Sequence, residues 1–552
     1  MRRDDGLFGP EAEDGDTASF SPGRFATRSL ALAALIVAAG FLGSRLLGLL
    51  RSVIIAEAFG TEPELDAYWV AFRLPDLVFQ LLAGATLASA FIPTFAAVST
   101  REGEAAAWRL ASSVLNLLLG ATVVFAVVAF FLAPVLVPVL APGLGEATGQ
   151  EEELTDLAID MTRLMLLSAV VFSVSGMFMG ILNARRHFLT PALAPMVYNL
   201  SIIVAALVSD DVYGLAVGVV VGSLIHLLIQ LPELRFAGMA YRLVADWRDT
   251  AVREVARLMG PRVLGLAATQ VNFYFIGIFF ASTLSAGAIS ALSFAWLITM
   301  TPMGVIGMAI STAAFPTLAE QAARRDVLLA STLRSALRLI IFLSLPIGAG
   351  TALLARPLVV VLLQRGAFDT ASTDLTADAL IFFAPALFAH SGIEILSRGY
   401  YATGDTRTPV AFAVTAMLIN LVLSALLVDA MELQGLALAL SIATALEFLL
   451  LLVALRQRIP ILMEDHLLRG LWRMAVATGA MALVVAASVV ALVEGAGLDP
   501  DRTLDALLIL IGGGATGVLA YFGCAHLLGL DEPAILLRRV SAMLGRPVRR
   551  AT

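Results

Sequence analysis

The sequence predicts an all-α protein that crosses a membrane many times. Of its 552 residues, 59% are hydrophobic and only 14% are charged. Soluble domains average roughly 45–50% apolar and about 25% charged residues. The apolar residues also gather in long runs between short polar loops, and a membrane-crossing helix needs about 20 such residues. These two observations exclude a soluble globular fold.

The apolar runs predict about fourteen transmembrane helices. They cover approximately residues 30–58, 67–98, 108–140, 156–183, 191–208, 212–233, 259–283, 287–318, 333–355, 375–402, 409–428, 433–455, 470–493 and 503–529. The second and eighth runs could each be broken. The polar residues 1–28 are expected to form a disordered tail without a cleavable signal peptide, and residues 530–552 to form a second tail.

The arginines alternate between loops as the positive-inside rule requires. Every second loop is basic, as in Arg185-Arg186 and in the segment 235–257. The intervening loops are acidic, as in EATGQEEELTD, SDDVYG and EGAGLDPD. This alternation supports the count of fourteen and places both termini in the cytoplasm.

Two parts of the chain resemble each other at an offset of about six helices. SAFIPTFAA near residue 94 is similar to TAAFPTLAE near residue 317. The two similar regions begin on odd-numbered runs, which cross the membrane in the same direction. The repeat predicts two parallel six-helix lobes, residues 29–233 and 255–456, followed by two further helices in 470–529. Chance similarity between apolar helices is the alternative. Two such lobes indicate transport through a central site.

The first run, FLGSRLLGLLRSVIIAEAFG, contains two arginines, Arg45 and Arg51. A charge in the bilayer centre costs about 2.5–3.5 kcal/mol on insertion scales, so such residues usually face a cavity or a partner. Ser44, Gly48 and Arg51 share one stripe of the helix. Snorkelling to the outer headgroups is the alternative, and it explains Arg51 better than the deeper Arg45.

Further polar residues lie in or beside the apolar runs. Asp66 and Arg73 share a face at the start of the second run, and an interfacial role suits Arg73 equally well. Arg262 opens the seventh run as a cytoplasmic anchor or a cavity residue. Glu394 lies on one helix face with His390 and Arg398. These three residues suit either proton coupling or a structural role in which their charges neutralise one another. Asn420 is expected to form an interhelical hydrogen bond.

These residues form no catalytic or metal-binding constellation. The sequence has no Walker A, HExxH or Gly-x-Ser-x-Gly motif, and its loops are too short for an enzyme domain. We therefore expect a transporter without a cofactor, driven by a sodium or proton gradient or by the membrane potential. Arginines favour an anionic cargo, because guanidinium binds phosphate and carboxylate groups bidentately.

Several motifs resemble the MurJ/MviN family of lipid II flippases in the MOP exporter superfamily. They are SRLLGLLRSVIIAEAFG, LDAYWVAFRLPDL, SAFIPTFA, LVVVLLQRGAFD and RGYYATGDTRTPV, in this order. The resemblance implies fourteen helices in two lobes, with two C-terminal helices that extend a lipid-accessible groove. It also implies alternating-access transfer of lipid-linked peptidoglycan precursors across the bacterial inner membrane, without nucleic acid, and contact with the cell-wall synthesis machinery.

The resemblance carries over to particular positions. Arg45, Arg51 and Asp66 match charged residues that the family needs. Phe79-Gln80 stands where the family has a basic pair, and Trp296-Leu297 where it has Asp-Arg. Arg73 or Arg262 would then have to complete the central cluster. Asn420 matches one ligand of the family's sodium site, but Ser424 replaces the acid one turn later.

Three other functions remain open at this point. The cargo could be another polyprenyl-linked glycan. A drug or cation exporter of the same superfamily is less expected, because such sites favour acids over arginines. From a different class, a non-transporting scaffold for envelope assembly would explain the lost central arginines.

Overall fold

The structure, a computed structural model, describes residues 24–83, 85–270, 276–324, 326, 328–459, 465–534 and 536. These residues fold into helices and loops without a strand. Ten of the helices in this part of the chain are long and apolar enough to cross a membrane. The all-α membrane class is confirmed, while the count of fourteen stays a prediction.

The first half of the chain forms one bundle, the N-terminal lobe. Its elements are α1 (Arg24–Phe59), α2 (Pro63–Val78), the π-helical η1 (Phe79–Ala83), α3 (Ala85–Glu102), α4 (Glu104–Leu140), the 3₁₀ turn η2 (Glu146–Thr148), α5 (Glu151–Ala184), α6 (Leu189–Val208), α7 (Val212–Leu228) and α8 (Leu231–Phe236). The first helix thus begins at Arg24, several residues before the expected start near Leu30.

The second half forms the C-terminal lobe and its two appended helices. Its elements are α9 (Thr250–Gln270), α10 (Ile276–Ala281), α11 (Ala288–Met303), the π-helical η4 (Gly304–Met308), α12 (Ala309–Ala323), α13 (Leu328–Leu353), α14 (Ala355–Leu362), α15 (Thr370–Phe383), the 3₁₀ turn η5 (Ala384–Ala386), α16 (Leu387–Ala402), α17 (Arg407–Arg458), α18 (Asp465–Val490), the π-helical η7 (Ala491–Gly495) and α19 (Thr503–Leu527). The residues of α17 form two helices that meet at a kink at Glu432 (φ 48°, ψ −129°), between the expected eleventh and twelfth spans.

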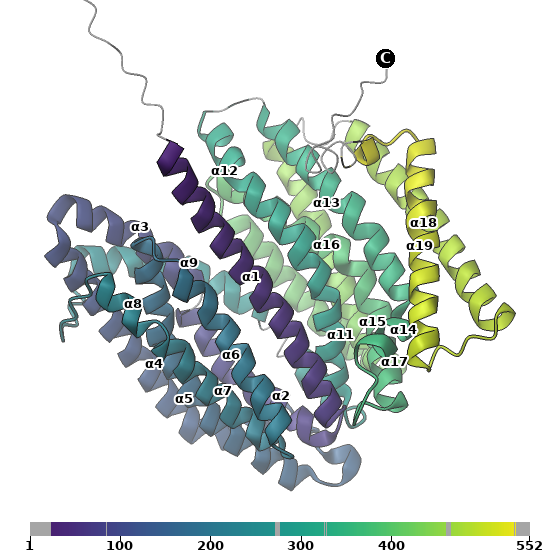
Figure 1. Ribbon diagram of the computed structural model, residues 1–552, viewed down its shortest axis with the longest axis horizontal. Helices are drawn as coiled ribbons and strands as arrows, with labels where there is room; N and C mark the ends of the chain where they lie inside the picture. Colours follow the sequence, from purple (N-terminus) through teal and green to yellow (C-terminus); the bar gives the residue numbers. More distant parts are fainter. Residues whose placement is uncertain are drawn as a thin grey trace, which may run out of the picture.

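Figure 1 shows the two lobes side by side, with α1 lying diagonally across the seam between them. Helices α18 and α19 pack against each other at the edge of the C-terminal lobe. This is the predicted arrangement of two bundles with two additional C-terminal helices. The expected lobe boundary at residue 255 falls within α9, whose Val252 and Val255 are buried with Phe91 and Phe95 of the N-terminal lobe.

The expected second and eighth spans both contain a π-helical segment. In the second span η1 follows Pro75, and in the eighth η4 follows Pro302. Proline donates no backbone hydrogen bond, which loosens the helical ladder around it. Short π-helical segments of this kind are frequent at functional sites. The two breaks therefore interrupt corresponding helices of the two lobes.

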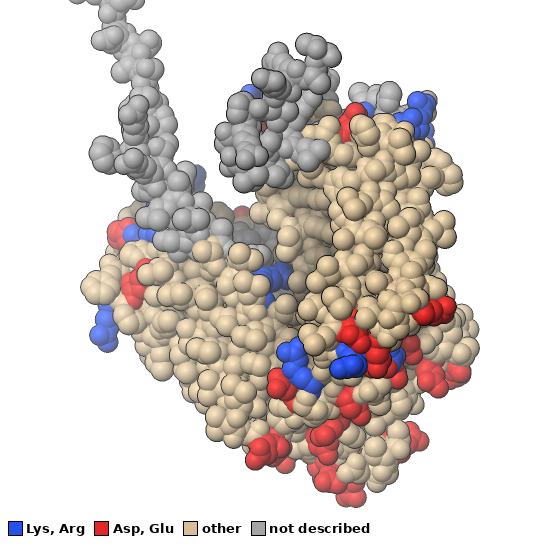
Figure 2. Space-filling view, turned by 45° about the vertical axis from the view of Figure 1, so that its right-hand side comes forward, with Lys and Arg blue, Asp and Glu red and all other residues tan. Residues whose placement is uncertain are grey.

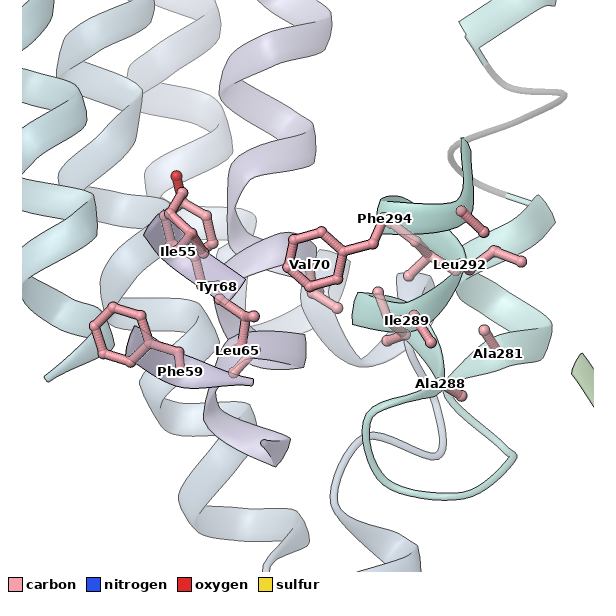
Figure 3. Packing of buried hydrophobic residues seen from close by; sticks show 14 of the residues in the cluster. Ile55, Phe59, Leu65, Tyr68, Val70, Ala281, Ala288, Ile289, Leu292 and Phe294 are labelled. Atoms are coloured by element: carbon pink, nitrogen blue, oxygen red, sulfur yellow. The ribbon is translucent and has the colours of Figure 1, made fainter. Parts of the chain in front are cut away.

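The lobes share a hydrophobic core at one end of the seam. Figure 3 shows Phe59 and Leu65 of the N-terminal lobe on one side and Ile289 and Phe294 of α11 on the other. These residues belong to a single buried cluster, and each is at most 5% exposed. At this end the two lobes are therefore in close contact.

Candidate functional site

The two ends of the molecule differ in charge. Figure 2 shows acidic side chains gathered at the lower end, which we call the acidic end. It contains the loops at residues 141–150, 209–211 and 496–502, and the opposite end contains the basic loops. Away from the acidic end, a hollow separates the two lobes, and basic side chains lie in its wall.

Asp66 joins the two lobes near the acidic end. This residue of α2 is 5% exposed, and Gly287 occupies the N-cap position of α11. The Asp66 carboxylate accepts the backbone N–H of Gly287 at 2.8 Å, and both the N–H and the hydroxyl of Ser290 at 2.7 and 2.6 Å. It thus satisfies donors that the first turn of α11 leaves unpaired, at the positive end of the helix dipole. In this conformation Asp66 fastens the lobes together and does not face the hollow.

Three glycines allow the backbones of the two lobes to meet at this seam. Gly60, Gly287 and Gly366 have φ values of 55°, 83° and 60°. A Cβ atom at these positions would lie 2.2–2.4 Å from the carbonyl oxygen of Ala367, Thr61 and Glu57, respectively, each from the opposite lobe. Glycine is needed for the left-handed conformation and for the close approach.

A chain of hydrogen bonds and an aromatic contact complete the seam. Thr61 donates its hydroxyl to Ser372 Oγ at 2.9 Å, and Ser372 donates to Asp369 at 2.9 Å. Trp69 meets the edge of Phe294 with ring centres 6.2 Å apart. These contacts hold the two lobes together at the acidic end.

Arg45 lies nearer the opposite end and contacts both lobes. Its side chain is exposed, and its Nη2 is 3.5 Å from the sulfur of Met308. Its guanidinium also lies against Gly304, where a Cβ atom would stand 2.9 Å from Nη1. An arginine on α1 therefore rests on the π-helical break of the eighth span, and the residue as a whole stays exposed.

Arg51 and Arg73 lie deeper in the same seam. Arg51 is half-buried, and its Nε has no hydrogen-bond partner among the described residues. Arg73 is 7% exposed, donates to Ser293 Oγ of the opposite lobe at 3.4 Å, and stacks 5.6 Å from the ring centre of Trp69. Among the described residues Arg51 Nε thus stays without a partner in this conformation, whereas Arg73 is engaged at the seam through Ser293 and Trp69.

The position of the family's basic pair has a different role in this chain. Gln80, on η1, donates its amide to the carboxylate of Asp76 at 2.7 Å. Both side chains are half-buried. An aromatic ring and a neutral amide therefore stand where the resemblance leads one to expect two cations, and the amide binds an acid.

The remaining predicted residues lie elsewhere. The side chain of Arg262, on α9, is outside the described residues. Glu394 lies 3.5 Å from Arg398, which stacks on Phe315, so the α16 stripe is at least partly self-neutralised. Asn420 is 3% exposed and accepts the hydroxyl of Ser424 at 3.4 Å. No cluster of metal-binding side chains occurs in the described part of the chain.

Sequence reasoning missed the partners of these residues. Gly287, Ser290 and Gly304 received no role, although Ser-Ala-Gly-Ala-Ile-Ser before an apolar run is a signal for a helix start. Nothing in the local sequence indicated that the cap of this helix would come from residue 66. Contacts between positions more than two hundred residues apart are decided by the packing of the lobes.

The two-lobed membrane bundle, in contact at one end and with arginines at the seam toward the other, is typical of a membrane transporter. The chain belongs to the lipid II flippase MurJ family, whose family model matches residues 55–498. It is 31% identical to the lipid II flippase MurJ of Burkholderia cenocepacia over 436 residues, which cover 77% of this chain and 84% of that protein. It is also 31% identical to the probable lipid II flippase MurJ of Vibrio cholerae over 441 residues, covering 77% and 82%.

Solved structures share the fold. A lipid II flippase MurJ in an inward closed conformation matches with a TM-score of 0.73 at 22% identity, covering 93% of this chain and 100% of that one. An inward-facing multidrug-resistance MATE transporter of the MOP superfamily matches with a TM-score of 0.65 at 17% identity, covering 76% and 95%. The fold is therefore that of the MOP transporters, as the sequence predicted.

Proposed function

We propose that this protein moves lipid II from the inner to the outer leaflet of the bacterial cytoplasmic membrane. Membership of the lipid II flippase MurJ family carries the proposal. The lobes meet at the acidic end through Asp66 and Gly287, and a hollow separates them toward the basic end. Such an arrangement suits a transporter that receives its cargo on one side of the membrane and releases it on the other.

The orientation follows from charge. Basic loops stay in the cytoplasm, so the acidic end would face outward and both termini inward. The conformation described above would then be closed to the outside and ready to receive cargo from the inner leaflet. Lipid II carries a pyrophosphate, and its peptide carries carboxylates. Both are groups that guanidinium binds well.

Arg45 and Arg51 are the proposed cargo contacts. Arg45 is exposed at the seam, and Arg51 has a buried Nε without a partner among the described residues. Arg73 would join them when the lobes separate and its contact with Ser293 breaks. Asp66 would act on the conformational change and not on the cargo, because its carboxylate is occupied by α11.

A second cargo is favoured by one observation. Gln80 and Leu297 replace basic residues of the family pattern, and Gln80 binds Asp76. A site with fewer basic residues suits a cargo with fewer negative charges, such as another polyprenyl-linked glycan.

For either cargo, the energy source would be a sodium or proton gradient or the membrane potential. Asn420 and Glu394 are the residues to examine for a role in coupling.

Complementation of a MurJ-depleted bacterium tests the proposal. We expect the wild-type chain to restore growth and Arg45→Ala to fail, because a charge-assisted hydrogen bond contributes about 1.5–3 kcal/mol, or roughly 10- to 100-fold in affinity. Arg407→Ala is the matched control, since Arg407 is an exposed arginine at the first residue of α17. Failure of the wild type despite normal membrane insertion would refute lipid II as the cargo. Full rescue by Arg45→Ala would refute the role of Arg45.

A further inference from the structure

The chain between α8 and α9, residues 237–249, forms an irregular strap that is fixed to α4. Asn116 donates its amide to the carbonyls of Arg242 and Val244 at 3.2 and 2.8 Å, and accepts the hydroxyl of Tyr241 at 2.8 Å. The N–H of Arg242 donates to Ser112 Oγ at 3.0 Å. Because an irregular segment must pair its backbone groups somewhere, these bonds hold the strap at one height on α4.

The depth of the strap follows from the lipid-facing surface of α4. Residues of this helix are mostly covered up to Leu118, and from Gly120 to Leu140 the outward face is apolar and exposed. At 1.5 Å per residue this face is about 31 Å long, close to the roughly 30 Å of a hydrocarbon core. Asn116 then lies about 6 Å beyond the core, within the headgroup layer of about 5–8 Å.

At this depth the strap and the end of α8 expose large apolar side chains. Phe236 is 85% exposed, Leu243 88%, Trp247 59% and Tyr241 50%. Trp and Tyr are typical of membrane interfaces, where one part of the ring lies against acyl chains and the other reaches polar groups. The strap therefore continues the lipid-facing surface of α4 into the headgroup layer.

Two arginines stand over the exposed tryptophan. The guanidinium carbons of Arg248 and Arg253 lie 5.2 and 5.7 Å from the ring centre of Trp247. Neither arginine forms an ion pair with any described residue. The nearby acids are used locally, since Asp246 accepts the N–H of Arg248 and Asp249 that of Ala251. Arg253 Nε donates to the carbonyl of Trp247 at 3.3 Å, and no other guanidinium donor of the pair has an acceptor among the described residues.

We propose that the interlobe strap binds anionic phospholipid headgroups of the leaflet at the basic end. The arginine pair supplies donors for the headgroup phosphate, and Leu243 and Trp247 enter the boundary between headgroups and acyl chains. A soluble protein partner is disfavoured, because the exposed apolar side chains lie level with the headgroups and not above them. The strap is fixed to α4 and leads into α9, whose Val252 and Val255 pack in the N-terminal lobe, so this contact anchors the N-terminal lobe.

A depth measurement tests the position of the strap independently of transport. In a Cys524→Ser background, a nitroxide at Leu243→Cys is measured in nanodiscs for its accessibility to oxygen and to a water-soluble nickel chelate. Val128→Cys, on the exposed face of α4, gives the lipid reference, and Glu152→Cys, in the acidic end, gives the water reference. We expect Leu243 to lie between them, nearer the lipid value. A value equal to that of Glu152 would overturn the proposal and favour a soluble partner.

Lipid retention tests the charge preference. The full-length protein is extracted from bilayers of equal phosphatidylglycerol and phosphatidylcholine, and the co-purified lipids are counted by mass spectrometry. Arg248→Gln/Arg253→Gln should lower the ratio of retained phosphatidylglycerol to phosphatidylcholine by roughly fivefold or more. Arg101→Gln/Arg407→Gln, two exposed arginines of the same end away from the strap, should leave it unchanged. Equal ratios for both double variants would contradict an anionic site on the strap.

Discussion

The carboxylate of Asp66 receives the backbone N–H of Ser290 at 2.7 Å, although 224 positions separate the two residues in the chain. A negative charge in the N-terminal lobe thereby completes the first turn of a helix in the C-terminal lobe. Such a bond exists only while the lobes are in contact at the acidic end. The Asp66–Ser290 pair therefore stabilises the conformation in which the lobes are in contact at the acidic end, and we call it the latch. The free energy of this hydrogen bond helps to set the population of molecules that are open at that end.

Asp66→Asn should weaken the latch. Asparagine keeps one acceptor but turns an N–H₂ group toward backbone donors, and the loss of a charged acceptor costs about 1.5–3 kcal/mol. We expect a larger open population at the acidic end, measured in a Cys524→Ser background as a longer spin-label distance between Glu62→Cys and Thr370→Cys, two exposed positions of opposite lobes. Glu64→Gln, on the first turn of the same helix, is the control. An unchanged distance distribution for Asp66→Asn would show that the latch is not limiting.

Gly287→Ala should open the same seam by a steric route. Its Cβ atom would stand 2.3 Å from the carbonyl oxygen of Thr61, at a φ of 83°. Gly497→Ala is a matched control, because Gly497 has a φ of 69° but no atom within 4 Å of its added Cβ. Both variants bear similar backbone strain of about 1–2 kcal/mol, because an L-residue is disfavoured in the left-handed region. Only Gly287→Ala should lengthen the spin-label distance, and equal behaviour of the two variants would argue against contact at Thr61.

Acid should loosen the hydrogen-bond chain from Thr61 to Asp369. The backbone N–H of Ser372 holds the pKa of the Asp369 carboxyl below its usual range. A lowered pKa in the folded state stabilises that state at pH values above the ordinary pKa, and the stabilisation is lost as the pH falls through the lowered value. Amide exchange at Ser372 and Thr373, corrected for intrinsic rates, should therefore show a loss of protection below about pH 4. Asp369→Asn should remove this pH dependence, and a dependence that persists in the variant would assign it to another group.

Arg338→Met should destabilise the attachment of the two C-terminal helices. Arg338 Nε donates to Glu532 at 2.6 Å, and Glu532 is 4% exposed. Removing one partner of a buried ion pair typically costs about 3–5 kcal/mol, because the remaining charge is left without compensation. The apparent Tm in detergent should fall, and Arg338→Met/Glu532→Gln should recover part of the loss. A double variant less stable than the single one would mean that Glu532 has another partner.

Much of this architecture follows from local sequence. The length of the apolar runs determines that the chain crosses a membrane, since a helix satisfies its own backbone hydrogen bonds in lipid. The second and eighth apolar runs were the two that could be broken, and the π-helical segments η1 and η4 lie within them. The motif resemblance led to the family before any contact was known. Each of these conclusions depends on residues that are close together in the sequence, and none requires knowledge of how the lobes pack.

The roles of the charged residues were decided by tertiary structure. Arg45 and Asp66 looked alike in sequence, as costly charges beside apolar runs, yet one is exposed with its guanidinium resting on Gly304 and the other is buried against Gly287. Residues 530–534 were expected to begin a tail, but Glu532 is buried against Arg338. The physical reason is that the energy of a charge depends on its partners and on its distance from water. The sequence determines which residues are charged, and the packing of two lobes determines what each charge meets.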